Sequence, residues 1–306
     1  MRIQTVSGQR GTDGIHCADA HGHLWVEPSN PGTPALNDER AASAEIADFA
    51  AAGGGLIVDC QPGGCGRNGT VLARLAASSN VAIVAPTGFH LERYYPHGSG
   101  VWATSEEAAG DLFEREVCDG LVEAPEVRAG VIKTAWASKG GQEDALMRAA
   151  LEVARRTDTG VVVHTEAGAG VEELVRIVED CRVSPGRIQL SHVDKRPEES
   201  LHCDLARAGY VLGYDTFLRP KYQPEHNVWR LLRAMLAEGL WKHITLGLDL
   251  VDVSMWHVSG GPGLRTLPLA VLPRLRDEGA SEEAMQALAA GNIIRALGRV
   301  DEDEAG

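Results

Sequence analysis

The stretch RAGVIKTAW, from Arg128 to Trp136, combines a buried-strand signal with a charge. Ala129 to Ile132 is a short apolar run of the kind that forms a strand covered on both faces, yet Lys133 follows at once. Lysine is rarely buried unless another group pairs with it. The stretch therefore predicts a buried strand that ends in a lysine with a specific task.

Other short apolar runs, rich in Val and Ile, likewise end in polar residues. Stretches with helical periodicity, such as 142–157 and 224–240, separate them. Apolar strands alternating with helices indicate a parallel sheet covered on both faces, and eight of them favour a closed (β/α)8 TIM barrel over an open sheet. The predicted strands are 14–24, 54–61, 81–89, 129–136, 160–167, 187–194, 209–215 and 243–249.

No linker or low-complexity segment divides the 306 residues, so we expect 1–306 to form a single α/β barrel domain. Two last helices, 263–279 and 281–298, would complete the barrel. The acidic tail 299–306 is expected to be frayed.

Composition restricts the partners and the compartment. A net charge of −14 argues against nucleic acid or an anionic membrane as the main partner. Neither a signal peptide nor a spanning segment is evident, so we expect a cytoplasmic protein with free thiols. Cys60 and Cys65 form a lone C-x4-C, which is a weak zinc signal because no second pair follows.

Metal-ligand residue types stand at the ends of five predicted strands. His21 and His23 are two residues apart, so they share one face of the first strand. The carboxyl ends of barrel strands form one active face, where all these side chains would converge. The full set is His21, His23, Lys133, His164, His192 and Asp249.

Each residue of this set has an ordinary explanation when taken alone. A strand-end histidine is usually a hydrogen-bonded polar residue, Asp249 could cap a helix, and Lys133 could reach solvent along its stem. The gathering of six such residues at one end of the strands favours metal binding over coincidence.

The ligand count points to two divalent ions, because it exceeds the three protein ligands of a catalytic zinc site. An ammonium group cannot bind a cation, but burial favours the neutral amine, which can react with CO2. Carboxylated in this way, Lys133 would bridge two ions roughly 3.5–4 Å apart that share a hydroxide. Zn is the expected metal, and Mn, Co, Ni or Fe would suit the same ligands.

The ligand pattern resembles the phosphotriesterase-like family of the amidohydrolase superfamily. That family has HxH after strand one, a carboxylated lysine after strand four, histidines after strands five and six, and aspartate after strand eight. Segments 59–90, 119–135 and 258–279 are similar to the family as well, and the likeness runs from about Gly14 to Gly298. One departure is Gly22, where family members often have Glu; we expect little effect on coordination.

The resemblance implies a role for each ligand. His21, His23 and Asp249 would hold the more buried ion, and His164 and His192 the more exposed one. Asp249 would take the proton of the metal-bridging hydroxide and deliver it to the leaving oxygen. Asp194 is expected either to support that proton path or to cap the next helix.

Loops after strands seven and eight are expected to determine the substrate. Arg219, Lys221 and Tyr222 follow strand seven, and Arg265 follows strand eight. In an acidic chain this cluster favours an anionic group such as phosphate, unless surface carboxylates pair with the same charges. The Lys-Tyr pair also resembles family members that hydrolyse phosphorylated sugar lactones.

The sequence thus predicts a metal-dependent hydrolase that opens a lactone ring, with a phosphorylated sugar lactone favoured. A phosphotriesterase or carboxylesterase with the same centre is the nearest alternative. A Schiff-base aldolase using Lys133 belongs to another class and leaves four strand-end histidines unexplained. A binding protein without catalysis is a third option, although no ligand position is missing. A homodimer is the expected assembly.

Overall fold

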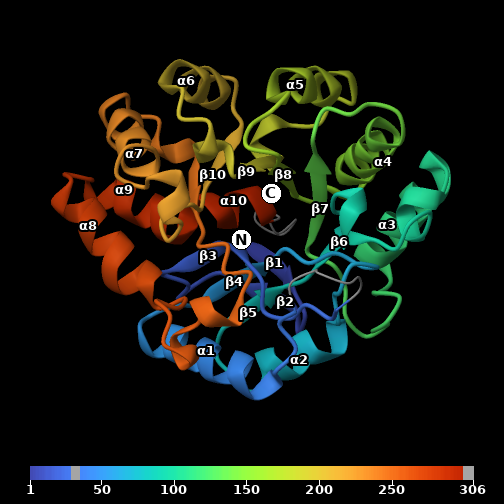
Figure 1. Ribbon diagram of the computed structural model, residues 1–306, viewed down its shortest axis with the longest axis horizontal. Coiled ribbons are helices and arrows are strands. Elements are labelled where there is room, and N and C mark those ends of the chain that lie inside the picture. The colour runs from blue at the N-terminus through green and yellow to red at the C-terminus, as the bar shows by residue number, and fades with distance from the viewer. Residues whose placement is uncertain (29–34, 299–306) are drawn as a thin grey trace, which may run out of the picture.

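The chain forms a ring of parallel strands surrounded by helices, as the computed structural model shows for residues 1–28 and 35–298 (Figure 1). The predicted (β/α)8 barrel is confirmed. The predicted frayed tail, 299–306, lies outside the described residues. The barrel strands are β3 (Ala18–Gly22), β4 (Leu56–Asp59), β5 (Ala82–Val84), β6 (Pro86–Gly88), β7 (Val131–Trp136), β8 (Val161–Thr165), β9 (Ile188–Ser191), β10 (Val211–Tyr214) and β11 (Ile244–Leu246).

Strand pairing runs in chain order around the ring, in two parallel ladders, β3-β4-β5 and β6-β7-β8-β9-β10-β11. Strand three of the barrel is split at Ala85 into β5 and β6, so the chain itself connects the two ladders there, and the Ala85 carbonyl accepts from the Gly130 N–H of the next strand at 2.9 Å. At the other junction, between β11 and β3, the Asp249 N–H donates to the His21 carbonyl at 3.0 Å. The chain at Ala85 and the bond at Asp249 connect the ladders into one ring.

A helix follows most barrel strands and covers the outside of the ring (Figure 1). The predicted helix 142–157 is found with the same bounds, whereas 224–240 is shortened at both ends. Each predicted C-terminal helix contains a π-helical turn, at 267–271 and 287–291. The helices are α1 (Glu39–Ala51), α2 (Gly69–Ala77), α3 (Glu106–Cys118), α4 (Gln142–Thr157), α5 (Val171–Asp180), α6 (Glu199–Arg207), α7 (Val228–Ala237), α8 (Leu272–Asp277), α9 (Glu282–Gln286) and α10 (Asn292–Leu297).

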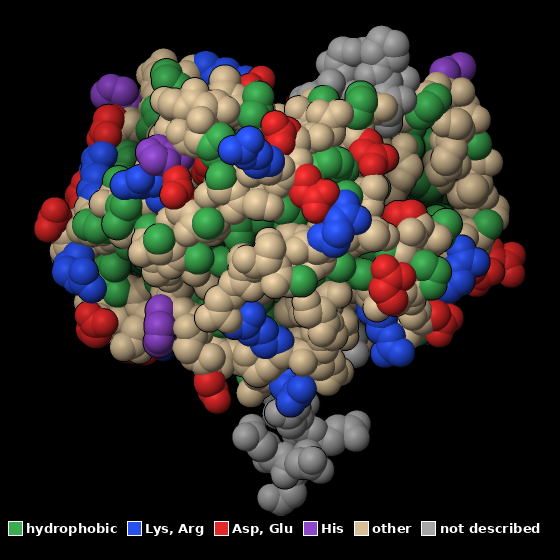
Figure 2. Space-filling view, turned by 90° about the horizontal axis from the view of Figure 1, so that it is seen from below, with side chains coloured by type: hydrophobic (Ala, Val, Ile, Leu, Met, Phe, Trp, Pro, Cys, Tyr) green, Lys and Arg blue, Asp and Glu red, His purple; other side chains and the backbone are tan. Residues whose placement is uncertain are grey.

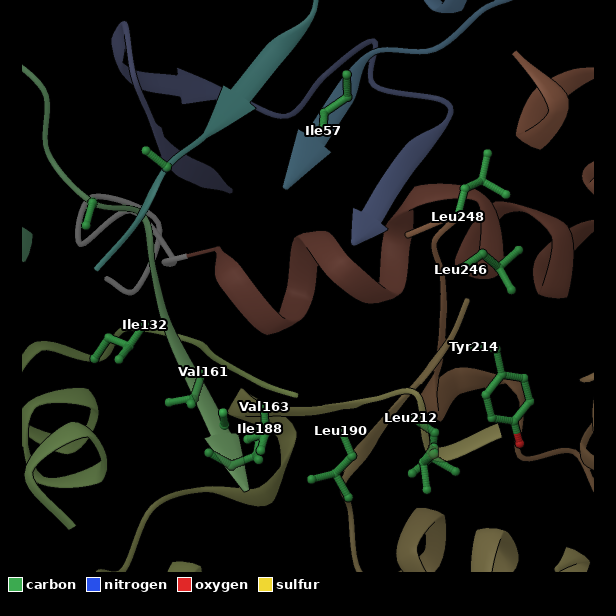
Figure 3. Close-up of a cluster of buried hydrophobic side chains, with 14 of the residues drawn as sticks. Ile57, Ile132, Val161, Val163, Ile188, Leu190, Leu212, Tyr214, Leu246 and Leu248 are labelled. Carbon is green, nitrogen blue, oxygen red and sulfur yellow. The ribbon is translucent and has the colours of Figure 1, made fainter. Parts of the chain in front are cut away.

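Alternation of side chains along each strand determines which residues enter the barrel. On β7, Val131 packs inside the ring, Ile132 packs outside against the helices, and Lys133 turns inward again. On β8, His164 follows the interior Val162 by two residues and also turns inward. Figure 3 shows the outward set, which includes Ile132, Val163, Leu190, Leu212 and Leu246.

The amino-terminal end of the barrel is closed. The hairpin of β1 (Arg2–Thr5) and β2 (Gly8–Gly11) contributes Ile3, and α10 contributes Ile293 and Leu297, to the interior cluster. The Asn292 side-chain amide donates to the Trp241 carbonyl at 2.8 Å, which fixes α10 across this end. Access to the interior polar side chains is therefore from the carboxyl ends of the strands.

A buried ion cluster joins strand three to α3 and to the neighbouring loops. The Arg67 guanidinium donates to Glu116 (NH1–Oε2, 2.9 Å), to Glu123 (Nε–Oε1, 2.6 Å) and to the Pro86 carbonyl (2.6 Å). The Thr87 hydroxyl donates to Glu116 at 2.6 Å. A buried arginine is stable only with such compensation.

Charged side chains of both signs are interspersed on the face that includes α1 and α2 (Figure 2). Among the described helices, none is long and apolar enough to cross a bilayer.

Candidate metal centre and substrate cavity

The six predicted ligands gather at the carboxyl ends of the strands, and five of them line a cavity of about 300 Å³. Lys133, the sixth, is not among the lining residues and is fully buried. Its Nζ is 3.4 Å from His21 Nε2. Asp249 Oδ1 lies 3.5 Å from His23 Nε2 and 3.9 Å from His21 Nε2. These distances bring one carboxylate, one amine and two imidazoles together.

His164 and His192 form the other side of the cluster. Their ring centroids are 4.7 Å apart, and the His192 ring is 4.6 Å from that of His21. Burial lowers the pKa of His21, His164 and His192, so these imidazoles are neutral at pH 7, the form that binds a metal ion.

Two of the predicted ligands have a backbone conformation that is uncommon for residues with a side chain. His192 has φ of 64° and Asp249 has φ of 50°, both in the left-handed region. In each residue the backbone N–H forms a hydrogen bond that fixes this conformation. The His192 N–H donates to Asp215 Oδ2 at 3.3 Å, and the Asp249 N–H donates to the His21 carbonyl. Such strain persists where surrounding contacts fix it, and it is typical of functional sites.

Asp215, which the sequence did not single out, orients two of the predicted ligands. Its Oδ2 is 3.1 Å from His21 Nδ1 and its Oδ1 is 2.7 Å from His192 Nδ1. Because a carboxylate accepts hydrogen bonds, both rings carry their proton on Nδ1 and keep a free lone pair on Nε2. Asp215 ends strand seven, so the rule that singled out the other strand-end residues applies to it as well.

Asp194 supports this arrangement from behind. Its Oδ2 accepts from the Thr216 hydroxyl at 2.6 Å and from the backbone N–H groups of Thr216 and Asp215, at 3.0 and 3.2 Å. Burial, followed by repulsion from Asp215, raises its pKa to about 8. Its side chain therefore fixes the loop after β10 instead of capping α6.

The donors fit divalent metal ions. His21, His23 and Asp249 offer ligand atoms that all lie within 4.8 Å of one another. His164 Nε2 is buried, and Glu166 Oε2 lies 3.7 Å from it, beyond hydrogen-bond distance, so this nitrogen keeps a free position for a metal ion. The proton positions fixed by Asp215 leave Nε2 of His21 and of His192 available, which adds one nitrogen to the atoms already named. These observations match the requirements of metal-binding histidines.

Gly22 separates the two histidines of the first strand, and the structure shows what occupies the space beside it. A Cβ at Gly22 would lie 2.8 Å from Ile57 Cγ2 and 3.3 Å from Asp19 Oδ2. Asp19 is buried, and its Oδ1 accepts from the N–H groups of His21 and Leu248 at 3.1 and 3.2 Å. The Asp19 carboxylate thus connects β3 to the segment that carries Asp249.

Three of the four predicted substrate residues line the cavity: Arg219, Lys221 and Tyr222. The Arg219 guanidinium donates to Asp249 Oδ2 at 3.1 Å. Lys195, which the sequence analysis missed, lines the cavity too, and its Nζ is 5.0 Å from the centre of the Tyr222 ring. Lys221 Nζ is 4.8 Å from the same ring, so two ammonium groups flank one phenol.

Arg265 is not among the residues that line the cavity. Its NH1 lies 3.3 Å from His257 Nε2. The loop that carries both residues is held to α1 by Glu45, whose carboxylate accepts from the backbone N–H groups of His257 and Leu264 at 2.7 and 2.6 Å. This anchoring keeps Arg265 beside His257.

Cys60 and Cys65 are buried, and burial raises the pKa of both thiols to about 12. Within the described residues, no group of possible metal ligands includes a cysteine. The structure therefore gives the weak C-x4-C signal no support.

The chain matches known proteins over nearly its whole length. The Phosphotriesterase family model matches residues 1–297. A phospho-furanose lactonase of Mycoplasmopsis synoviae is 28% identical over 326 aligned positions, covering 96% of this chain and 91% of that protein. A phosphotriesterase homology protein of Escherichia coli is 23% identical and covers 86% of this chain and 91% of its own length.

Solved structures agree on the fold. A lactonase from Listeria monocytogenes superposes with a TM-score of 0.90 at 21% identity, covering 98% of this chain and 100% of that one. The Escherichia coli phosphotriesterase homology protein, solved with phosphate in its active site, gives a TM-score of 0.84 at 21% identity, covering 92% and 98%. Enzymes of this family use a binuclear metal centre. The chain belongs to the phosphotriesterase family and is a hydrolase of ester bonds.

Proposed function

We propose that this protein opens the ring of a lactone that carries a phosphate group, most simply a phosphorylated sugar lactone. The observation that carries the proposal is the position of Lys195 and Lys221, which flank Tyr222 on the wall of the cavity that also contains the candidate ligands. The phospho-furanose lactonase relatives and the phosphate in a related active site support it.

His21, His23 and Asp249 would hold one divalent ion, and His164 and His192 a second. A carbamate on Lys133, formed from the buried amine and CO2, would bridge them. When bound, the two ions would supply an activated water near neutral pH and polarise the ring carbonyl. Zn is proposed as the metal, with Mn, Co, Ni or Fe as alternatives.

Asp249 is proposed to move the proton. Its carboxylate reaches the imidazole nitrogens of the cluster and also contacts Arg219, at 3.1 Å. We propose that Asp249 accepts the proton of the attacking water and transfers it to the ring oxygen that leaves. The Arg219 guanidinium would keep this carboxylate oriented.

The phosphate would lie at the rim, away from the reacting carbonyl. Lys221 is exposed, and Lys195 and Tyr222 are half-buried, so their polar groups can bind an anion that remains partly hydrated. An ammonium–phosphate contact is a charge-assisted hydrogen bond worth about 1.5–3 kcal/mol, or roughly 10–100-fold in affinity.

The direct test is a screen of the metal-reconstituted enzyme against lactones with and without phosphate, with a pH indicator to detect acid release. We expect the highest kcat/KM for a phosphorylated sugar lactone. If neutral phosphate triesters or simple carboxylic esters were hydrolysed faster than every lactone, the phosphotriesterase or carboxylesterase alternative would replace this proposal.

The phosphate contact is tested by Lys221→Ala, with Lys242→Ala as the matched control. Lys242 pairs with Glu283 at 3.3 Å and precedes β11, at the closed end of the barrel. We expect Lys221→Ala to raise KM about 10-fold or more for phosphorylated lactones only, and the control to change nothing. An equal rise for phosphorylated and neutral lactones would contradict the proposed contact.

A further inference from the structure

We propose that His90 is a further catalytic residue, which donates a hydrogen bond from Nε2–H to the substrate oxygen that becomes negative when the ring carbonyl is attacked. This inference rests on the proposed ester or lactone hydrolysis. His90 follows β6, at the carboxyl end of strand three, and lines the same cavity as His164 and Asp249.

The backbone of His90 is held on both sides. Its N–H donates to the Tyr95 hydroxyl at 3.1 Å, and its carbonyl accepts from the Trp102 indole at 2.9 Å. The Tyr95 hydroxyl in turn donates to the Gly63 carbonyl at 3.3 Å. A donor fixed in this way needs little reorganisation when charge develops in front of it.

A further bond defines the proton position on the ring. The Leu91 N–H donates to His90 Nδ1 at 2.7 Å, so Nδ1 must be the acceptor and a neutral ring carries its hydrogen on Nε2. His21 and His192 have the opposite proton position, on Nδ1, because that nitrogen faces the Asp215 carboxylate. His90 is therefore arranged as a hydrogen-bond donor and not as a metal ligand.

The surroundings of His90 direct this donor to the cavity. The ring centroid is 4.7 Å from that of His164 and 4.5 Å from that of Tyr94. His90, Tyr94 and His164 all line the cavity, so a substrate oxygen bound there can accept the hydrogen bond from His90 Nε2–H.

The test compares two substitutions at position 90 with a control. His90→Phe removes the donor and keeps a planar ring, whereas His90→Gln keeps an N–H donor on a side chain of similar reach. The matched control is His16→Phe, because His16 is exposed and precedes β3, at the end of the strands away from the cavity. For each variant, kcat and KM are measured with a lactone and with a 4-nitrophenyl ester, together with bound metal.

We expect His90→Phe to lower kcat by about 10²–10³-fold for both substrates, with KM and bound metal close to wild type. His90→Gln should recover at least a tenth of the lost rate, and His16→Phe should match wild type. An unchanged kcat in His90→Phe, or a loss of bound metal in that variant, would overturn the assignment. A fall in kcat confined to the lactone would overturn it as well, because it would place the donor at the leaving oxygen.

The two proposals can fail separately. If wild type opens no lactone but cleaves another ester, the proposed substrate is wrong, and His90 is then tested on that ester. If wild type opens lactones and His90→Phe does so equally fast, only the role of His90 is wrong.

Discussion

Replacing Asp215 with asparagine should weaken metal binding even though the shape of the side chain is preserved. Asp215 accepts from both His21 Nδ1 and His192 Nδ1. An asparagine has one acceptor and one donor end, so whichever way the amide turns, one imidazole faces an N–H group. That ring would have to move its proton to Nε2, the nitrogen needed for the metal.

The magnitude follows from the number of rings involved. Loss of a partner behind one metal-binding histidine typically costs about 10–100-fold in metal affinity. Only one of the two imidazoles loses its acceptor in Asp215→Asn, so the loss should be about 10–100-fold, which corresponds to about 1.4–2.7 kcal/mol. Asp215→Ala removes the acceptor from both rings and should cost more, about 10²–10⁴-fold.

The assay is competition for Zn²⁺ with a chromophoric chelator, combined with metal analysis after dialysis. Asp252→Asn is the control, because Asp252 is an exposed carboxylate whose Oδ1 accepts from the Ser254 N–H at 2.8 Å. A Zn²⁺ affinity in Asp215→Asn within a few fold of wild type would show that Asp215 does not control the ring protons, and the reasoning would be refuted.

Three further outcomes are expected. Lys133→Ala should lose most bound metal and recover part of it with a short-chain carboxylic acid; a variant that keeps two ions unaided would falsify the carbamate bridge. Glu116→Gln should lower the free energy of unfolding in urea by about 3 kcal/mol, because Arg67 stays buried with less compensation, whereas Glu39→Gln, in an exposed pair, should change it little. His202 is buried and its pKa is lowered, so below about pH 6.5 the unfolded chain gains a proton that the folded state does not. Wild type should therefore lose up to about 1.4 kcal/mol per pH unit relative to His202→Gln between pH 6.5 and 5, and parallel stability curves for the two proteins would contradict this.

The sequence was informative where a regular geometric rule applies. Parallel strands end on one face of a barrel, and side chains alternate along each strand, so the inward positions of Lys133 and His164 could be predicted from Val131 and Val162. The same rule predicts the shared face of His21 and His23. These strand positions could be predicted without knowing the conformation of any loop.

The sequence was less informative where the result depends on which residues meet across the fold. Asp215 and His90 also end strands, but their roles depend on proton positions that only their neighbours reveal. Lys195 becomes a cavity residue through its contact with Tyr222, which lies on another loop. Arg265 was expected at the cavity, and only the anchoring of its loop to α1 explains why it lies beside His257.

The contact between Glu45 and the last loop has a consequence for how this enzyme can change. Glu45 binds the loop through its main chain, where its carboxylate accepts from the N–H groups of His257 and Leu264. The backbone path of the loop therefore depends on a residue of the first helix, some 210 positions earlier in the chain. Exposed positions such as Val253 and Val258 are free to vary without altering that path. Val251, near the start of the same segment, lines the cavity, so a substitution there could change the substrate preference with the supporting framework left intact.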